Sequence, residues 1–370
     1  MTTSTATSIK PFTISVPQAD LDDVADRLAR TRFTQAIDDD ASTHGIAVNR
    51  VKHLVEYWQH SYDWRAWERR LNSYPQFTTE IDGTNIWFLH ILSDREDALP
   101  LILTHGWPGS VVEFLDLIEP LTEAGFHLVI PSMPGYGFSG PTTESGWNNN
   151  RIAAAWVELM RRLGYERYGA AGNDGGSMIS PEVGRLDPEH VVGVHVSQVF
   201  AFPSGDPAEL QDLSEDEQQA LQTLTWFWEE AGAFNMLQSQ QPQTLAHAIE
   251  DSPAGLVGWN SQLLGEPLDD EFVITNIAIY WFTATAGSSM RLYYENNKLM
   301  KEGATGAEPT TVPLGLAGSV NDFFGIRRFA DRDHSNIVSW NVYDTQTHYL
   351  AHEEPELLAK DVVGFYSGLR

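Results

Sequence analysis

Apolar side chains recur at helical spacing in the first part of the chain. A short amphipathic helix is predicted over residues 18–31 by three apolar positions at steps of three and four, Leu21, Val24 and Leu28. Residues 49–71 continue the helical spacing and are rich in large aromatics without catalytic polar groups, which favours packing against another part of the protein over ligand binding. We therefore predict a helical N-terminal segment over residues 1–76.

From residue 77 the pattern changes to short apolar runs separated by turn residues. These runs are typical of strands, and they are TTEI (78–81), NIWFLHIL (85–92), LPLILTH (99–105), HLVIPS (127–132), YGAAGND (168–174) and VVGVHVS (191–197). Helical spacing returns between them at 112–122 and 150–163. Strands that alternate with helices predict an α/β fold with a mostly parallel sheet covered on both faces.

The alternation stops over residues 206–300, which are mainly helical, and strand-like segments resume near 309–314 and 337–343. The simplest interpretation is an insertion between two halves of one α/β core, residues 77–205 and 301–370. Such an insertion is expected to form a lid over the carboxyl ends of the strands, where open α/β sheets bind ligands.

Composition narrows the function classes. The 370 residues include 51 acidic and 23 basic side chains, and the formal charge of −28 disfavours binding to nucleic acid or to anionic lipid. The absence of cysteine excludes a disulfide scaffold, a thiolate nucleophile and thiolate-bound metal, and it fits a cytoplasmic protein. No apolar run is long enough for a signal peptide or a membrane span, so no membrane partner is expected.

The strongest candidate for chemistry is the turn Gly172-Asn173-Asp174-Gly175-Gly176 after the strand-like run at 168. It has the glycine spacing of a nucleophile elbow, with aspartate where esterases have serine. Glycines two positions either side of the aspartate permit a strained turn from strand to helix that exposes the central side chain. A glycine-rich turn with a capping aspartate is the alternative interpretation.

A second motif, His105-Gly106-Trp107-Pro108-Gly109-Ser110, follows the strand-like run at 99–105. Its small residues and proline place a backbone N–H, from Trp107, where it could face a developing oxyanion. The second N–H is expected from Gly175, directly after the nucleophile. An ordinary turn after a strand is the alternative, but the two motifs in this order favour an oxyanion hole.

The third candidate element lies near the C-terminus, where His348 follows a strand-like run and precedes a helical one. The order nucleophile, acid, histidine is that of α/β hydrolases, with the acid on a loop after the preceding strand. Asp322 occupies that place. Competing acids at this stage are Asp331, Asp333 and Asp344.

With these motifs the chain resembles the microsomal-type epoxide hydrolases over nearly its whole length, including their N-terminal meander. The likeness rests on HGWPGS at 105–110, the aspartate elbow, S-x-R-x-Y-Y-E-N at 289–296 and H-Y-x-A-x-E-x-P from His348. The resemblance implies an α/β-hydrolase core, Asp174 as nucleophile, His348 as base, Asp322 as its partner and Tyr293 as a lid hydroxyl donor to the epoxide oxygen. The residues expected to contact the substrate are Trp107, Pro108, Phe234 and Tyr294.

The sequence departs from the family pattern at three places. The position of the second lid tyrosine, read from its eight-residue distance to Pro242, holds Phe234, and Tyr294 is the candidate replacement donor. Gly175 stands where a large aromatic usually follows the nucleophile. Gln346-Thr347 replaces the usual glycine pair before the histidine.

The implied reaction converts an epoxide and water to a vicinal diol through an ester on Asp174, and it needs no metal or organic cofactor. An ionised carboxylate can attack an sp³ carbon without prior deprotonation. Two alternatives stay open: a haloalkane-type dehalogenase, in which Trp107 would bind halide, and a binding protein that has lost turnover. The family resemblance is also compatible with a homodimer.

Overall fold

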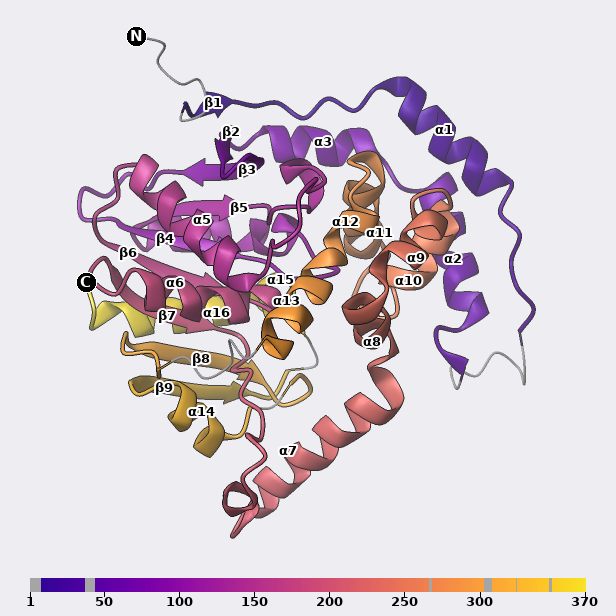
Figure 1. The fold of residues 1–370 in the computed structure, drawn as a ribbon. Helices are drawn as coiled ribbons and strands as arrows, with labels where there is room; N and C mark the ends of the chain where they lie inside the picture. The colour runs from indigo at the N-terminus through magenta and orange to yellow at the C-terminus, as the bar shows by residue number, and fades with distance from the viewer. Residues whose placement is uncertain (1–7, 37–43, 266–267, 303–307, 324, 346–347) are drawn as a thin grey trace.

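A computed structural model describes residues 8–36, 44–265, 268–302, 308–323, 325–345 and 348–370. A nine-stranded sheet runs through these residues in the order β1-β2-β3-β5-β4-β6-β7-β8-β9 (Figure 1). The strands are β1 Lys10–Pro11, β2 Gln76–Ile81, β3 Thr84–Ile91, β4 Leu99–Thr104, β5 Phe126–Pro131, β6 Tyr168–Gly172, β7 Val191–Val196, β8 Leu314–Ser319 and β9 Ile337–Tyr343.

Neighbouring strands are parallel throughout the part β5-β4-β6-β7-β8-β9. The pairs β1–β2, β2–β3 and β3–β5 are antiparallel. Strands β4, β6 and β8 are buried at every residue, as expected for parallel strands with both faces covered. The mostly parallel sheet predicted from the strand pattern is therefore confirmed.

Helices cover both faces of the sheet. Consecutive residues of β7 point to opposite faces, so their contacts show which helix lies on which face. A Cβ on Gly193 would lie 3.0 Å from the ring of Phe365, on one face. A Cβ on Gly184 would lie 3.0 Å from Val194, the next residue of the strand and therefore on the other face. The core helices are η4 Val111–Leu117, α4 Ile118–Glu123, η5 Gly137–Ser139, α5 Asn149–Arg162, α6 Gly175–Leu186, α14 Arg327–Asp333, α15 Leu350–Glu353 and α16 Pro355–Ser367.

The N-terminal helices are α1 Gln18–Ala29, α2 Val48–His60 and α3 Trp64–Asn72. Their aromatic side chains pack against the inserted helix α11, Asp270–Phe282: the rings of Trp64 and Phe282 are 4.8 Å apart, and Trp67 Nε1 donates to Glu271 Oε1 at 2.9 Å. The packing role predicted for these aromatics is confirmed.

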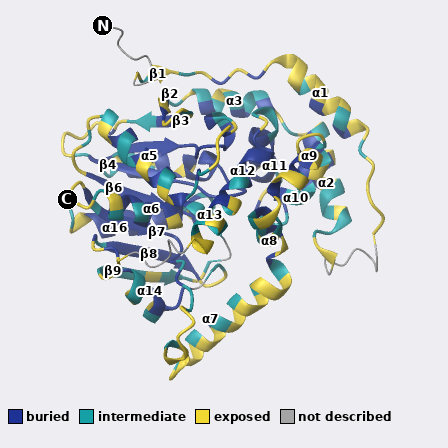
Figure 2. Ribbon diagram, in the orientation of Figure 1, coloured by how far each residue is buried: buried dark blue, intermediate teal, exposed yellow. Residues whose placement is uncertain are grey.

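The inserted segment is helical as predicted, and we call residues 206–300 the lid. The helices that begin within it are η6 Pro207–Leu210, α7 Glu215–Trp226, η7 Phe227–Ala231, α8 Ala233–Gln240, α9 Pro242–Ile249, α10 Pro253–Asn260, α11 Asp270–Phe282, α12 Ala286–Ser289 and α13 Arg291–Lys301. Helix α7 projects from the body and is largely exposed, whereas the central strands β4, β6 and β8 are buried (Figures 1 and 2). Among the helices that the structure describes, none combines the length and apolarity needed to cross a bilayer.

Two local predictions are wrong. The strand expected near 309–314 begins only at Leu314, because Pro313 has no N–H to donate to the sheet. The helix expected over 112–122 is divided into the 3₁₀ turns of η4 and the short helix α4. The proposed domain boundaries stay predictions.

Candidate active site

The aspartate elbow joins β6 to α6 as the sequence predicts. Asp174 has φ 51° and ψ −117°, a conformation rare for a residue with a side chain. A Cβ on Gly172 would lie 2.3 Å from the carbonyl carbon of Gly176, and one on Gly176 would lie 1.8 Å from Thr104 O. Only glycine fits both positions, and the tight turn holds the Asp174 carboxylate above the end of the sheet.

Two backbone N–H groups face that carboxylate. Trp107 N donates to Asp174 Oδ1 at 2.9 Å, and the N–H of Gly175 also stabilises the charged form. The Trp107–Pro108 peptide is cis, and a Cβ on Gly106 would lie 2.0 Å from Asp174 Oδ1. The structure thus brings the N–H groups of Trp107 and Gly175 to the Asp174 carboxylate, and their role as an oxyanion hole stays a prediction. The buried Pro108 lies in the same loop.

His348 and Asp322 lie next to the second oxygen of the Asp174 carboxylate, the one that does not accept from Trp107. His348 Nδ1 lies 2.8 Å from Asp322 Oδ1, and His348 Nε2 lies 3.6 Å from Asp174 Oδ2. The competing acids are elsewhere: Asp331 pairs with Arg327, Asp333 pairs with Arg332, and Asp344 is exposed. Of the acids considered from the sequence, Asp322 is the one in contact with the ring.

Burial and charge act against each other in this group. Burial favours the neutral ring, but the carboxylates of Asp322 and Asp174 outweigh it and raise the pKa of His348 to about 9. For Asp322, burial is outweighed by His348 and by hydrogen bonds, so its pKa is lowered. Burial raises the pKa of Asp174, and His348 and the two N–H groups partly offset this effect.

Gln198, which sequence reasoning missed, connects the two acids. Its Oε1 accepts hydrogen bonds from Asp174 N at 2.8 Å and from Ser177 Oγ at 2.9 Å. Its Nε2 donates to Asn173 Oδ1 at 2.8 Å and to Asp322 Oδ2 at 2.5 Å. The amide is buried and has a partner on each side, so it fixes the elbow relative to the acid. No motif marks it; its only signal is its position just after β7.

Aromatic lid residues enclose the carboxylate from above. Phe234 stacks on Trp107 with ring centroids 5.6 Å apart, and Tyr293 meets both rings edge-on at 5.9 and 6.1 Å. Burial and the charge of Asp174 raise the pKa of Tyr293 well above its usual value, so its hydroxyl stays protonated. The structure therefore brings Tyr293 and Phe234 together over the site.

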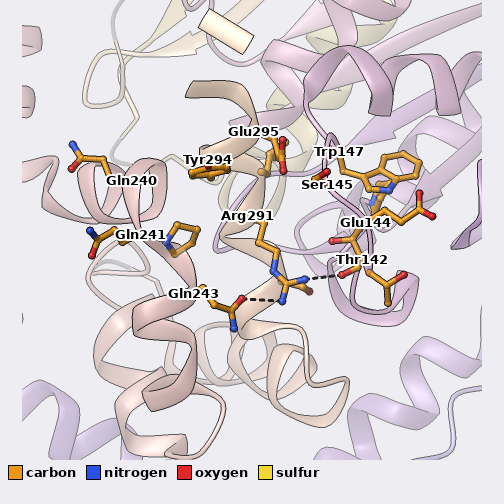
Figure 3. Close-up of a pocket in the computed structure, with 15 residues that line it drawn as sticks. Thr142, Glu144, Ser145, Trp147, Gln240, Gln241, Gln243, Arg291, Tyr294 and Glu295 are labelled. Carbon is orange, nitrogen blue, oxygen red and sulfur yellow. Dashed lines mark hydrogen bonds between the residues drawn. The ribbon is translucent and has the colours of Figure 1, made fainter. Parts of the chain in front are cut away.

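The side chain of Tyr294 points away from the cluster formed by Trp107, Phe234 and Tyr293. Its side chain is 44% exposed and lines an outer groove with Glu144, Arg291 and Gln241 (Figure 3). Consecutive helical residues point about 100° apart, so Tyr293 and Tyr294 cannot both face the carboxylate. The expectation that Tyr294 replaces the second lid donor is wrong in this geometry. The departure at Gln346-Thr347 lies outside the described residues.

The chain is similar to known proteins over most of its length. Residues 9–114 match the family model described as epoxide hydrolase N terminus, and residues 100–248 match the α/β hydrolase fold. A Stigmatella aurantiaca protein named "Putative epoxide hydrolase" is 38% identical, over 98% of this chain and 86% of the relative. "Epoxide hydrolase 1" of Sus scrofa is 30% identical, over 97% and 88%. The structure of Aspergillus niger epoxide hydrolase has a TM-score of 0.87 at 30% identity, over 99% of this chain and 98% of that one.

The fold and the matched model define an α/β-hydrolase-fold enzyme. The chain belongs to the epoxide hydrolase family, because its similarity to these enzymes extends over almost its whole length. Hydrolysis of an epoxide to a diol fits this assignment. The relatives support neither the dehalogenase alternative nor the binding-protein alternative.

Proposed function

We propose that this epoxide hydrolase works through an ester on Asp174 that is then hydrolysed with His348 as base and Asp322 as its partner. One observation carries the proposal: Asp174 Oδ1 accepts the N–H of Trp107, while Oδ2 lies 3.6 Å from His348 Nε2. One oxygen is thus held in place, and the other is available to attack a carbon.

In the first step, Asp174 Oδ2 attacks an epoxide carbon and the bond from that carbon to the ring oxygen breaks. The oxygen leaves with the bonding pair and takes a proton from the Tyr293 hydroxyl. A phenol is a suitable acid because the alkoxide that forms is far more basic than a phenolate. Phe234 has no hydroxyl, so the proposal assigns a single lid donor to this step.

In the second step, water attacks the Asp174 carbonyl carbon and gives a proton to His348 Nε2. Negative charge develops on Oδ1, where the N–H groups of Trp107 and Gly175 stabilise it. The tetrahedral intermediate then breaks its bond to the diol oxygen, which takes the proton from His348. Asp174 is regenerated as a carboxylic acid with one oxygen derived from water, and it ionises by releasing its proton to solvent. The Tyr293 phenolate regains a proton from solvent, and Asp322 holds the ring of His348 in the required tautomer.

The aromatic enclosure supports an apolar epoxide as substrate. Trp107, Phe234 and Tyr293 form a continuous ring cluster over the carboxylate, and Phe227 extends it with a centroid distance of 6.1 Å from Phe234. Apolar walls with few polar groups favour substrates that carry aliphatic or aromatic substituents on the epoxide.

The proposal is tested by intact-protein and peptide mass spectrometry after mixing with a panel of apolar epoxides. We expect the mass of one epoxide on the peptide containing Asp174. After one turnover in H₂¹⁸O, we expect the label in that aspartate. If diol forms while the peptide never gains either mass, water attacks the epoxide directly and the proposal fails.

We also propose a cytoplasmic location and a homodimer, supported by the lack of cysteine and by the family resemblance, respectively. Cell fractionation tests the first, and light scattering of the purified protein tests the second.

A further inference from the structure

A buried acid beneath the site has no role in the steps above. Glu113, on η4, is 1% exposed, and neither carboxyl oxygen has a hydrogen-bond partner of ordinary geometry among the described residues. Burial raises the pKa of Glu113 well above its usual value and so favours the neutral carboxylic acid. Buried polar groups are nearly always hydrogen-bonded to protein or to water, so this one requires an explanation.

A second unpartnered group lies next to it. Asn173 is 3% exposed, and its Oδ1 accepts a hydrogen bond from Gln198 Nε2 at 2.8 Å. Its Nδ2 is therefore directed away from Gln198 and has no hydrogen bond of ordinary geometry among the described residues, although a looser hydrogen bond from Asn173 to Glu113 lowers that acid's pKa. Asn173 directly precedes Asp174, so this donor lies beside the proposed nucleophile.

The acid also lies beneath the histidine loop. The point where Gly109 would carry a Cβ is 2.6 Å from Glu113 Oε2 and 3.0 Å from a ring carbon of Tyr349. Tyr349 follows His348 in the chain, and the two rings meet edge-on with centroids 5.1 Å apart. The charges of His348 and Asp174 also act on the pKa of Glu113, which agrees with this proximity.

A water molecule that attacks an ester can make up to four directed contacts. One lone pair faces the carbonyl carbon and one hydrogen faces the base, which leaves one hydrogen to donate and one lone pair to accept. The site offers an acceptor in the carboxyl group of Glu113 and a donor in Asn173 Nδ2, and neither has a hydrogen bond of ordinary geometry among the described residues. The set is complementary to the two contacts that remain.

We propose that Glu113 and Asn173 hold the hydrolytic water between His348 Nε2 and the carbonyl carbon of the Asp174 ester, an inference that rests on the proposed function. Glu113 accepts one water hydrogen and keeps its own proton, and His348 takes the other. Both residues touch the reacting water and not the epoxide. They act in ester hydrolysis and not in ester formation.

The test separates the two steps by single-turnover kinetics with styrene oxide as probe. Glu113→Gln keeps a neutral acceptor oxygen, whereas Glu113→Met fills the same space without one. Ser180→Ala is the matched control, since Ser180 Oγ on α6 is also buried without a described partner. Thermal melting confirms that each variant is folded before the rates are compared.

We expect Glu113→Met to form the ester within about threefold of the wild-type rate and to hydrolyse it about 100-fold more slowly, so that the ester accumulates. Glu113→Gln should hydrolyse the ester within about tenfold of wild type, and Ser180→Ala should match wild type. Hydrolysis by Glu113→Met at the wild-type rate overturns the inference, as does a folded Glu113→Gln that is as slow as Glu113→Met.

The proposed function fails in a different way. If no ester forms on Asp174 in wild type or in any variant, the covalent mechanism is wrong. If the ester forms and accumulates in His348→Gln but not in Glu113→Met, the mechanism stands and only the water-binding role of Glu113 is lost.

Discussion

His348 Nε2 lies 3.6 Å from Asp174 Oδ2, so the proposed base and nucleophile form an ion pair before substrate binds. Burial opposes a charged ring, yet Asp322 and Asp174 together raise the pKa of His348 to about 9. Ester formation removes the negative charge of Asp174 and with it one of the two main contributions. The pKa of His348 must then fall, and the ring becomes a base only when it is needed.

This coupling predicts different pH profiles for the two steps. A raised pKa keeps His348 protonated below about 9 in the free enzyme, but the ester form needs the neutral ring. Hydrolysis of the accumulated ester should therefore rise with pH through a midpoint below 9 and level off above it. Rapid-quench measurement of the ester after a pH jump gives this midpoint. A pH-independent hydrolysis rate contradicts the assignment of His348 as base.

Replacing the base should trap the intermediate. His348→Gln leaves the Asp174 carboxylate able to attack, while loss of general base catalysis should slow ester hydrolysis by about 100- to 10,000-fold. Mass spectrometry should find protein that gains the mass of one epoxide and retains it. Asp174→Ala is the control and should gain no mass. Turnover of His348→Gln at the wild-type rate would exclude the proposed role.

The lid geometry predicts a single hydroxyl donor. Tyr293→Phe should slow ester formation by about 30- to 1000-fold, because a hydrogen bond to a charging oxygen contributes about 2 to 4 kcal/mol to the transition state. Tyr294→Phe is the matched control on the neighbouring, outward-facing position and should keep the wild-type rate. Single-turnover ester formation distinguishes them. If both variants form the ester at the wild-type rate, neither tyrosine donates to the epoxide oxygen.

Phe234 provides the converse experiment. Its ring stacks on Trp107 and meets Tyr293 at 6.1 Å, so Phe234→Tyr adds a second hydroxyl above the carboxylate. Ester formation on simple epoxides should become faster if that hydroxyl reaches the ring oxygen. An unpaired buried phenol would instead lower stability by about 1 to 3 kcal/mol, which thermal melting detects. A slower reaction at unchanged stability argues against a donor at this position.

Gln198 should act through its neighbours. Gln198→Met removes the hydrogen bonds to Asp174 N and to Asp322 Oδ2, so the acid and the ring lose their fixed orientation. Loss of such an outer partner typically costs about 10- to 100-fold in activity. We expect ester hydrolysis to slow more than ester formation. Equal slowing of both steps, with lower melting temperature, would indicate a purely structural role.

The local sequence determined the α/β fold and the turn that carries Asp174. The alternation of strand and helix patterns was enough for the parallel sheet, because burial of both faces requires continuous apolar strands. The glycines around Asp174 were readable because only glycine can make the elbow turn. The start of β8 was missed because the apolar pattern does not show where a proline interrupts the hydrogen-bond ladder.

Tertiary structure decided what surrounds those residues. Gln198 contacts Asp322 across 124 positions, and Glu113 lies beneath a histidine loop near the other end of the chain. Tyr293 and Tyr294 are equivalent in sequence, and only the rotation of α13 turns one inward and the other outward. The proposed nucleophile, base and acid leave local signatures, since each sits on a turn with its own chemistry. Their supporting groups leave none, because packing between distant elements determines which polar atoms meet.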